Sequence, residues 1–192
     1  MGGHTAIHMK TLNTKTTALL LIDVINDFEF EGSEQLLRYA LPAAKRLARL
    51  KERLAGEGVP VIYVNDNFGR WQSDFKEQIV RCSSVDSFGR DVANRLLPVE
   101  GEYFVLKPKH SGFYSTSLDV LLGFLGIETL ILAGFASDIC VLYTANDAYM
   151  RDYQLVIPSD CVAAESKERN ALALRHMKTL LKARVVNSRS IL

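Results

Sequence analysis

The sequence predicts an α/β fold, a doubly wound sheet of six mainly parallel strands with helices on both faces. Two observations predict this fold. Short, continuously apolar runs recur along the chain, as expected for strands that helices cover on both sides. Amphipathic runs with helical spacing separate them, which indicates right-handed crossovers between parallel strands. The expected architecture is therefore a Rossmann-like, three-layer α/β/α arrangement.

The first predicted strand, residues 17–24 (TALLLIDV), is almost entirely apolar. A helix is predicted over 34–55, because leucines and alanines recur at helical spacing until Gly56 and Gly58 end the pattern. The other predicted strands cover residues 59–65, 102–107, 128–135, 153–158 and 183–187. The other predicted helices cover residues 86–97, 116–125, 139–151 and 167–182.

A chain of 192 residues favours a single domain. We assign this domain to residues 17–192, and we expect residues 1–16, which lack the apolar core of a signal peptide, to form a flexible arm. A net charge of +1 gives no support to nucleic-acid binding. No apolar run reaches the roughly 20 residues of a membrane span. The three cysteines, an odd number without metal-like or C-x-x-C spacing, favour a cytoplasmic protein with reduced thiols.

Ligand sites of doubly wound sheets lie beyond the carboxyl ends of the strands, near the point where the strand order reverses. Asp23 lies at the end of the first predicted strand, and residues 65–67 (NDN) lie at the end of the second. Lys107 ends the third strand, and Cys140 comes shortly after the fourth. An acid, a base and a thiol therefore reach the same edge of the predicted sheet.

Cys140 is the strongest candidate for a reactive group. The segment before it turns from strand to helix, with Ser137 or Asp138 as the expected N-cap. In the first turn of a helix, the free N–H groups and the helix dipole favour a thiolate and can hold an oxyanion. The alternative is a buried structural cysteine, which is our interpretation of Cys82 and Cys161.

The two charged candidates have structural alternatives. Asp23 at the end of an apolar strand is costly to bury unless it is paired, but it could also cap a helix or hold Mg²⁺. Lys107 could be a surface lysine, and Lys109 competes for any role given to it. A Cys–His pair through His110 is possible, although the neighbouring lysines disfavour it. Neither G-x-G-x-x-G nor a P-loop motif occurs, so no nucleotide cofactor is expected.

Three segments together carry a family resemblance. LLLIDVINDF, VLKPKHSGFYST and GFASDICVLYTANDA resemble, in this order, motifs of the isochorismatase-like cysteine hydrolases, which include nicotinamidases and carbamoyl-amide hydrolases. The resemblance extends from about Ala18 to the last predicted strand. It implies a catalytic triad of Asp23, Lys107 and Cys140, with Lys107 preferred to Lys109 because it stands four residues before the S-G-F motif.

The resemblance also implies a cis peptide bond between Phe135 and Ala136, and an oxyanion hole formed by the Ala136 and Cys140 amides. The implied activity is hydrolysis of a C–N bond in a small amide or carbamoyl compound through a thioester, without a metal or other cofactor. Asp23 would accept the thiol proton and return it to the leaving amine, while Lys107 stabilises the ion pair.

The expected partners are a small-molecule substrate and further copies of the chain in a dimer or tetramer, the usual assemblies of the family. The residues that we expect to contact the substrate are Asn26, Phe28, Trp71 and Phe113. For the three aromatic residues, ordinary core packing is the alternative.

Several other activities remain as alternatives. Nicotinamidases carry a metal-binding Asp and several His after the second strand, whereas NDNFGRWQSDF here contains no histidine, which disfavours that activity. Isochorismatase-type cleavage of a vinyl ether would use Asp23 as a general acid, but those enzymes often have glycine in place of Cys140. A non-catalytic binding or regulatory protein is a third alternative. A redox-sensing role of Cys140 ranks last, because no cysteine lies near it in the sequence.

Overall fold

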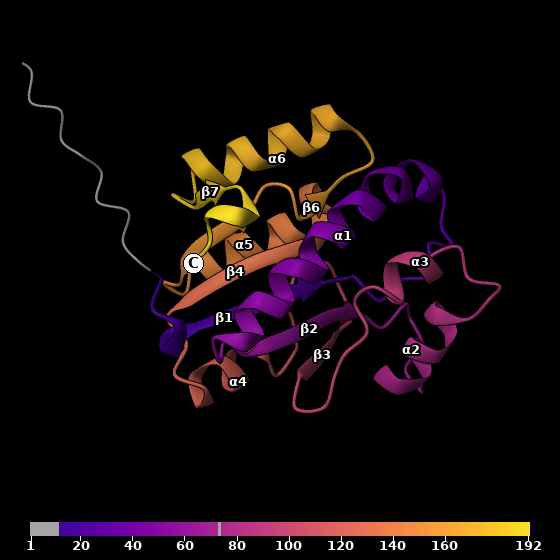
Figure 1. The fold of residues 1–192 in the computed structure, drawn as a ribbon, viewed down its shortest axis with the longest axis horizontal. Coiled ribbons are helices and arrows are strands. Elements are labelled where there is room, and N and C mark those ends of the chain that lie inside the picture. Colours follow the sequence, from indigo (N-terminus) through magenta and orange to yellow (C-terminus); the bar gives the residue numbers. More distant parts are fainter. Residues whose placement is uncertain (1–11, 73) are drawn as a thin grey trace, which may run out of the picture.

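A parallel β-sheet forms the centre of the fold (Figure 1). The computed structural model describes residues 12–72 and 74–192. The strands are β1 (Thr17–Ile22), β2 (Val61–Asp66), β3 (Tyr103–Lys107), β4 (Thr129–Phe135), β5 (Gln154–Pro158), β6 (Val162–Ala163) and β7 (Arg184–Val186). Their order is β3-β2-β1-β4-β5-β7, with β6 pairing with β4, and every pair is parallel. The strand order therefore reverses between β1 and β4, where a ligand site is expected.

Helices cover both faces of this sheet (Figure 1). They are α1 (Ser33–Gly56), α2 (Phe75–Ser83), α3 (Arg90–Ala93), α4 (Leu118–Phe124), α5 (Leu142–Tyr149) and α6 (Lys167–Thr179). Side chains alternate along each strand, so Leu19 and Leu21 of β1 pack with α1, α2 and α3. Leu20 and Ile22 of the same strand pack with α4, α5 and α6. The predicted three-layer α/β/α fold is confirmed.

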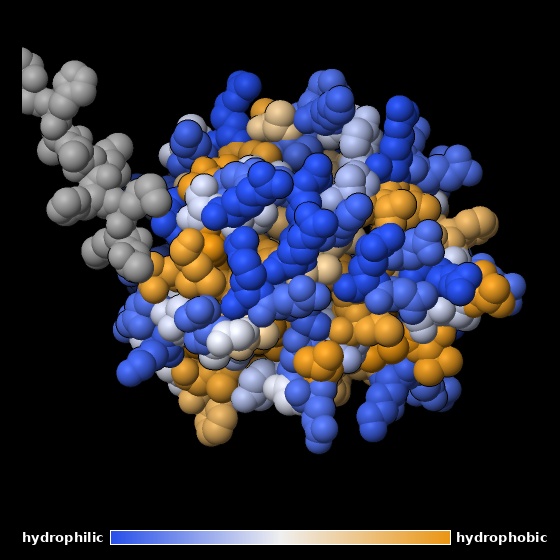
Figure 2. All heavy atoms as spheres, viewed as in Figure 1, coloured by the Kyte–Doolittle hydropathy of each residue, from blue (hydrophilic) through white to orange (hydrophobic). Residues whose placement is uncertain are grey.

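The outer face of α1 carries charged side chains, among them Arg38, Lys45 and Arg49, which are exposed. Figure 2 shows mainly hydrophilic residues on this face of the molecule, with apolar residues between them. None of the described helices has the length and apolar character needed to cross a membrane.

The structure adds one β-strand and one α-helix that the sequence did not predict. β6 is a two-residue strand, and α2 forms where no helix was expected. α2 begins after Asp74, whose Oδ1 accepts a hydrogen bond from the Glu77 N–H at 2.9 Å. This D-x-x-E spacing is a helix-start signal that the sequence contains. The helix predicted over 86–97 is much shorter, because only Arg90–Ala93 is α-helical.

The structure describes only residues 12–16 of the expected N-terminal arm. Residues 1–11 lie outside the described residues. A 3-10 helix, Thr14–Thr16, follows Asn13, and the Thr16 carbonyl accepts a hydrogen bond from the Glu128 N–H at 2.8 Å. The described end of the expected arm is therefore regular structure that leads directly into β1.

Gly134 permits a close contact between the two central strands. It has a φ of +119°, and a Cβ at this position would lie 2.0 Å from the Ile22 carbonyl oxygen. Only glycine tolerates this backbone conformation and this contact together. The backbones of β4 and β1 therefore lie unusually close together at Gly134, just before the chain turns toward Cys140.

Candidate active site

Four strands bring polar side chains to one edge of the sheet. Asp23 follows β1, Asp66 ends β2, Lys107 ends β3, and Cys140 lies in a π-helical turn (Ser137–Val141) after β4. The register places Asp66 directly beside Lys107. It also places Ile22, the residue before Asp23, between β2 and β4. The parallel sheet therefore brings together groups that are far apart in the sequence.

Lys107 lies at the centre of this group. Its side chain is completely buried, and its Nζ lies 2.9 Å from Asp23 Oδ2 and 3.3 Å from Asp66 Oδ2. The same Nζ lies 3.6 Å from Cys140 Sγ. The three residues predicted as a triad are thus within the roughly 4–6 Å over which charges shift each other's pKa. Asp66 is a fourth member, which the sequence placed at a strand end without a role.

The backbone holds Asp23 in an uncommon conformation. Its φ is +51°, and its N–H donates a hydrogen bond to the Val64 carbonyl at 3.0 Å. Its Oδ1 accepts a hydrogen bond from the Asp66 N–H at 2.7 Å. A non-glycine residue with positive φ costs of order 1–3 kcal/mol, and such residues cluster at functional sites. Both carboxylate oxygens of Asp23 are therefore engaged, one by a backbone N–H and one by Lys107.

Burial and mutual charge determine the protonation of this site. Burial raises the pKa of the Cys140 thiol, and the neighbouring Asp23 carboxylate raises it further. Burial also raises the pKa of Asp23, although Lys107 opposes this shift. Burial alone would lower the pKa of Lys107, but the negative charges around it, Asp23 first, outweigh burial and raise its pKa. Burial and the Asp23 carboxylate therefore oppose the effect of the helix start, which favours a thiolate, and they support the expectation that Asp23 must take the proton of the Cys140 thiol.

Side chains of the turn that carries Cys140 bind residues of α6 and do not cap the turn itself. Ser137 Oγ donates a hydrogen bond to Asn170 Oδ1 at 2.7 Å, and Asp138 Oδ2 lies 2.5 Å from Arg169 Nε. The turn has no side-chain N-cap, so the prediction of Ser137 or Asp138 in that role is wrong. Both side chains contact α6 instead.

The peptide bond before this turn, Phe135–Ala136, is cis. Among the described residues, none accepts a hydrogen bond from the Ala136 N–H. This donor, next to the turn that carries Cys140, is free to bind a ligand atom.

Thr144 connects the segment of Lys107 to the helix of Cys140. Its Oγ1 accepts a hydrogen bond from the Gly112 N–H at 3.0 Å and donates one to the Cys140 carbonyl at 2.7 Å. Ser111 makes a second connection, because its Oγ donates to the carboxylate of Asp147 on α5. The S-G-F segment therefore fixes the lysine and the cysteine relative to each other.

The four residues predicted to contact the substrate lie in different surroundings. Phe28 and Phe113 are 1% and 6% exposed and pack in the two hydrophobic clusters on opposite faces of the sheet. Asn26 Oδ1 accepts a hydrogen bond from the Phe28 N–H at 2.7 Å. Trp71 is 79% exposed and lines a hollow of about 600 Å³ with residues of the β2–α2 segment and α2. Their contacts with substrate stay a prediction.

His110 and Lys109 follow Lys107 closely in the sequence, and both are exposed. His110 Nδ1 lies 4.0 Å from Cys140 Sγ. The ion pairs with Asp23 and Asp66 are made by Lys107, not by Lys109.

The other two cysteines are fully buried and free. Burial raises the pKa of Cys82 and of Cys161 to about 12. Both have the surroundings of structural cysteines, as predicted. Across residues 12–72 and 74–192, no three His, Cys, Asp or Glu side chains are grouped so that they could hold a metal ion.

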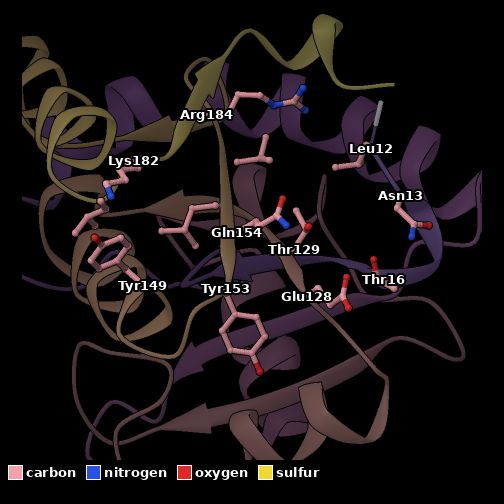
Figure 3. Close-up of a pocket in the computed structure, with 13 residues that line it drawn as sticks. Leu12, Asn13, Thr16, Glu128, Thr129, Tyr149, Tyr153, Gln154, Lys182 and Arg184 are labelled. Atoms are coloured by element: carbon pink, nitrogen blue, oxygen red, sulfur yellow. The ribbon is translucent and has the colours of Figure 1, made fainter. Parts of the chain in front are cut away.

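A second hollow lies at the opposite edge of the sheet (Figure 3). It also has a volume of about 600 Å³, and its lining includes Glu128, Tyr153, Gln154 and Arg184 near the amino ends of β4, β5 and β7. Lys107, Asp23 and Cys140 lie at the carboxyl ends of the strands, so this hollow is separate from their site.

Comparison with known proteins identifies relatives over almost the whole chain. A family model described as the isochorismatase domain matches residues 17–190. The chain is 42% identical over 175 residues to the uncharacterized isochorismatase family protein YaaI of Bacillus subtilis, covering 91% of this chain and 96% of that protein. It is 27% identical over 191 residues to the ureidoacrylate amidohydrolase RutB of Methylobacterium radiotolerans, covering 84% of this chain and 74% of the relative.

A solved structure has the same fold and a similar sequence. The N-carbamoylsarcosine amidase of Thermoplasma acidophilum superposes with a TM-score of 0.70 and is 28% identical, covering 92% of this chain and 98% of the other.

Proposed function

Because the chain belongs to the isochorismatase family of hydrolases, we propose that it is a cysteine hydrolase. Its reaction is cleavage of a C–N bond in a small amide or carbamoyl compound through a covalent thioester on Cys140. Asp23, Lys107 and Cys140 form its catalytic triad, and the reaction needs no metal or other cofactor.

One observation carries this proposal: a completely buried lysine contacts both the carboxylate and the thiol. Lys107 Nζ lies 2.9 Å from Asp23 Oδ2 and 3.6 Å from Cys140 Sγ. A buried charge is costly unless it is paired, so a structural role would be fulfilled by Asp23 alone. The additional contact with the thiol places the Lys107 ammonium group where it can stabilise the negative charge that forms on the sulfur.

In the first half of the reaction, Asp23 removes the proton from the Cys140 thiol. The raised pKa of Asp23 supports this role, because it makes the carboxylate a stronger base. Lys107 offsets the negative charge that passes from the carboxylate to the sulfur. The thiolate attacks the carbonyl carbon, and the protonated Asp23 then gives its proton to the leaving nitrogen.

The carbonyl oxygen becomes negative during this attack. The backbone N–H groups of Ala136 and Cys140 form its oxyanion hole. The unpaired Ala136 N–H supports this assignment, since it needs no existing hydrogen bond to be broken. Water then cleaves the thioester, which releases the acid and regenerates the thiol.

The named activities of relatives support a C–N bond as the target. An N-carbamoylsarcosine amidase and a ureidoacrylate amidohydrolase are both named as enzymes of amide hydrolysis. We extend this bond type, and not their particular substrates, to the present chain.

Vinyl-ether hydrolysis is a second candidate, and the raised pKa of Asp23 favours it. A carboxyl group that stays protonated to higher pH is a better general acid. In that reaction Cys140 would form no covalent bond. The two candidates therefore differ in whether activity depends on the sulfur.

A screen for ammonia release from small amides, ureas and carbamates tests the proposal, with Cys140→Ala as the blank. We expect at least one substrate class to release ammonia only with the wild-type chain. A Cys140→Ala protein that remains active would rule out the thioester mechanism. Failure of Cys140 to react with iodoacetamide before Cys82 and Cys161 would favour a non-catalytic binding protein instead.

The proposal also includes a reducing, cytoplasmic environment and assembly into a dimer or tetramer. Three free cysteines support the first part. Light scattering of the purified chain tests the second part, and a monomeric mass would contradict it.

A further inference from the structure

A histidine faces the nucleophile from the side of the solvent. His110 is exposed, and its Nδ1 lies 4.0 Å from Cys140 Sγ. Lys107 and Asp23 are buried. The sulfur therefore lies between a buried ion pair and an exposed imidazole.

Neighbouring contacts position this imidazole. The ring of Tyr143, three residues after Cys140, has its centroid 5.6 Å from that of His110. Pro108 precedes the histidine by two residues and restricts the backbone. The hydrogen bond of Ser111 to Asp147 fixes the residue that follows His110. One short segment therefore supplies both Lys107 and His110.

The second half of the proposed reaction requires a base for the attacking water. Asp23 is 5% exposed, and the Asp66 N–H and Lys107 bind its two oxygens, whereas His110 is an exposed base near the same sulfur. Water reaches the thioester from the solvent, and His110 lies on that side.

We infer that His110 is the general base that activates water for hydrolysis of the thioester, an inference that rests on the proposed function. Neutral His110 takes a proton from water while the water oxygen forms a bond to the acyl carbon. The tetrahedral intermediate then collapses, the bond from carbon to sulfur breaks, and the product acid leaves. His110 returns its proton to the sulfur, across the 4.0 Å contact, so that Cys140 is again a thiol and the imidazole is neutral.

The test uses p-nitrophenyl acetate, an activated ester that acylates reactive thiols whatever the natural substrate is. Nitrophenolate release follows both steps, and peptide mass spectrometry detects the acetyl group on Cys140. The variants are His110→Gln, which removes the base, and Lys109→Gln, a matched control in the same exposed segment. Cys140→Ala gives the background, and circular dichroism shows that each variant is folded.

We expect His110→Gln to show a stoichiometric burst, an acetylated Cys140 peptide, and a steady-state rate lowered about a hundredfold or more. Lys109→Gln should turn over like the wild type. A His110→Gln variant within about twofold of the wild-type steady state overturns the inference. A slow His110→Gln variant that accumulates no acetyl group on Cys140 also overturns the inference. A wild-type protein whose acetylated Cys140 is never hydrolysed does so as well.

The inference and the proposed function fail in different ways. If Cys140 is acetylated and its hydrolysis does not depend on His110, only the inference fails. If no acetyl group forms on Cys140 and Cys140→Ala retains the burst, the covalent mechanism fails and the inference fails with it.

Discussion

Lys107 Nζ lies 2.9 Å from Asp23 Oδ2, and neither side chain is more than 8% exposed. An ion pair at this depth is weakly screened by solvent, so each charge depends on the other. The pair also lies beneath Cys140, whose sulfur is 3.6 Å from the same ammonium group. We therefore expect removal of either charge to lower both the free energy of unfolding and the rate of hydrolysis.

Removal of the cation alone should destabilise the fold. Lys107→Met leaves the Asp23 carboxylate buried without its partner, and we expect a loss of about 3–5 kcal/mol in the free energy of unfolding. The double variant Lys107→Met/Asp23→Asn removes both charges and should recover most of this loss. Both variants should be inactive in amide hydrolysis. Urea unfolding of the three proteins measures the effect; a double variant as unstable as the single one would show that the ion pair is not the cause.

Loss of the neighbouring anion should make the thiol more reactive. Burial and Asp23 both raise the pKa of Cys140, so alkylation by iodoacetamide should be slow at neutral pH and accelerate as the pH rises. Asp23→Asn keeps the burial and Lys107 but removes the negative charge, which lowers the thiol pKa and moves the rate profile to lower pH. We expect faster alkylation of Cys140 in a variant that no longer hydrolyses amides.

Peptide-resolved mass spectrometry measures this effect, with Cys82 and Cys161 as controls within the same protein. Their rates should not change, because they are buried and other residues surround them. Slower alkylation of Cys140 in Asp23→Asn would contradict this prediction, because it would mean that Asp23 affects the thiol mainly as a base and not as a neighbouring negative charge.

A methyl group at Gly134 should disturb the contact between β1 and β4. The added Cβ would lie 2.0 Å from the Ile22 carbonyl oxygen at a φ of +119°, so we expect Gly134→Ala to cost about 3 kcal/mol or more. Gly123→Ala is the control, because nothing lies within 4 Å of its Cβ and it sits in α4. There alanine should stabilise by about 0.5–1 kcal/mol. Equal effects of the two substitutions on the thermal midpoint would contradict the close contact.

Replacement of Thr144 by valine should affect both stability and turnover. Valine keeps the shape but leaves the buried Gly112 N–H without its acceptor, at a cost of about 1–3 kcal/mol. The link between the Lys107 segment and the Cys140 helix is lost, so kcat should fall more than KM rises. Thr179→Val is the control, since Thr179 is exposed and bonds only within α6. It should change stability by less than about 0.5 kcal/mol; a similarly mild Thr144→Val would refute the connecting role.

The sequence was sufficient to predict the parallel sheet and the meeting of Asp23, Lys107 and Cys140 at one edge of it. Buried parallel strands are continuous apolar runs, and residues at their carboxyl ends must share an edge. The role of Asp66 was not predicted, because its ion pair with Lys107 depends on the register of β2 and β3, which no local sequence pattern specifies.

The errors near Cys140 have a common physical origin. Ser137 and Asp138 look like N-caps locally, but Asn170 and Arg169 of α6, about thirty residues away, bind them instead. The start of the helix favours a thiolate, whereas burial of the sulfur, a property of the packed structure, raises the pKa of the Cys140 thiol. Interactions with distant elements and desolvation are the contributions that sequence spacing does not contain.

The most direct test of the account is mass spectrometry of the enzyme quenched with acid during turnover of an amide found in the ammonia screen. We predict an acyl group on the peptide that contains Cys140, formed and lost at rates that match ammonia release, and absent in Cys140→Ala. Turnover without any modified Cys140 peptide, together with ammonia release by Cys140→Ala, would contradict the claim that this cysteine is the nucleophile.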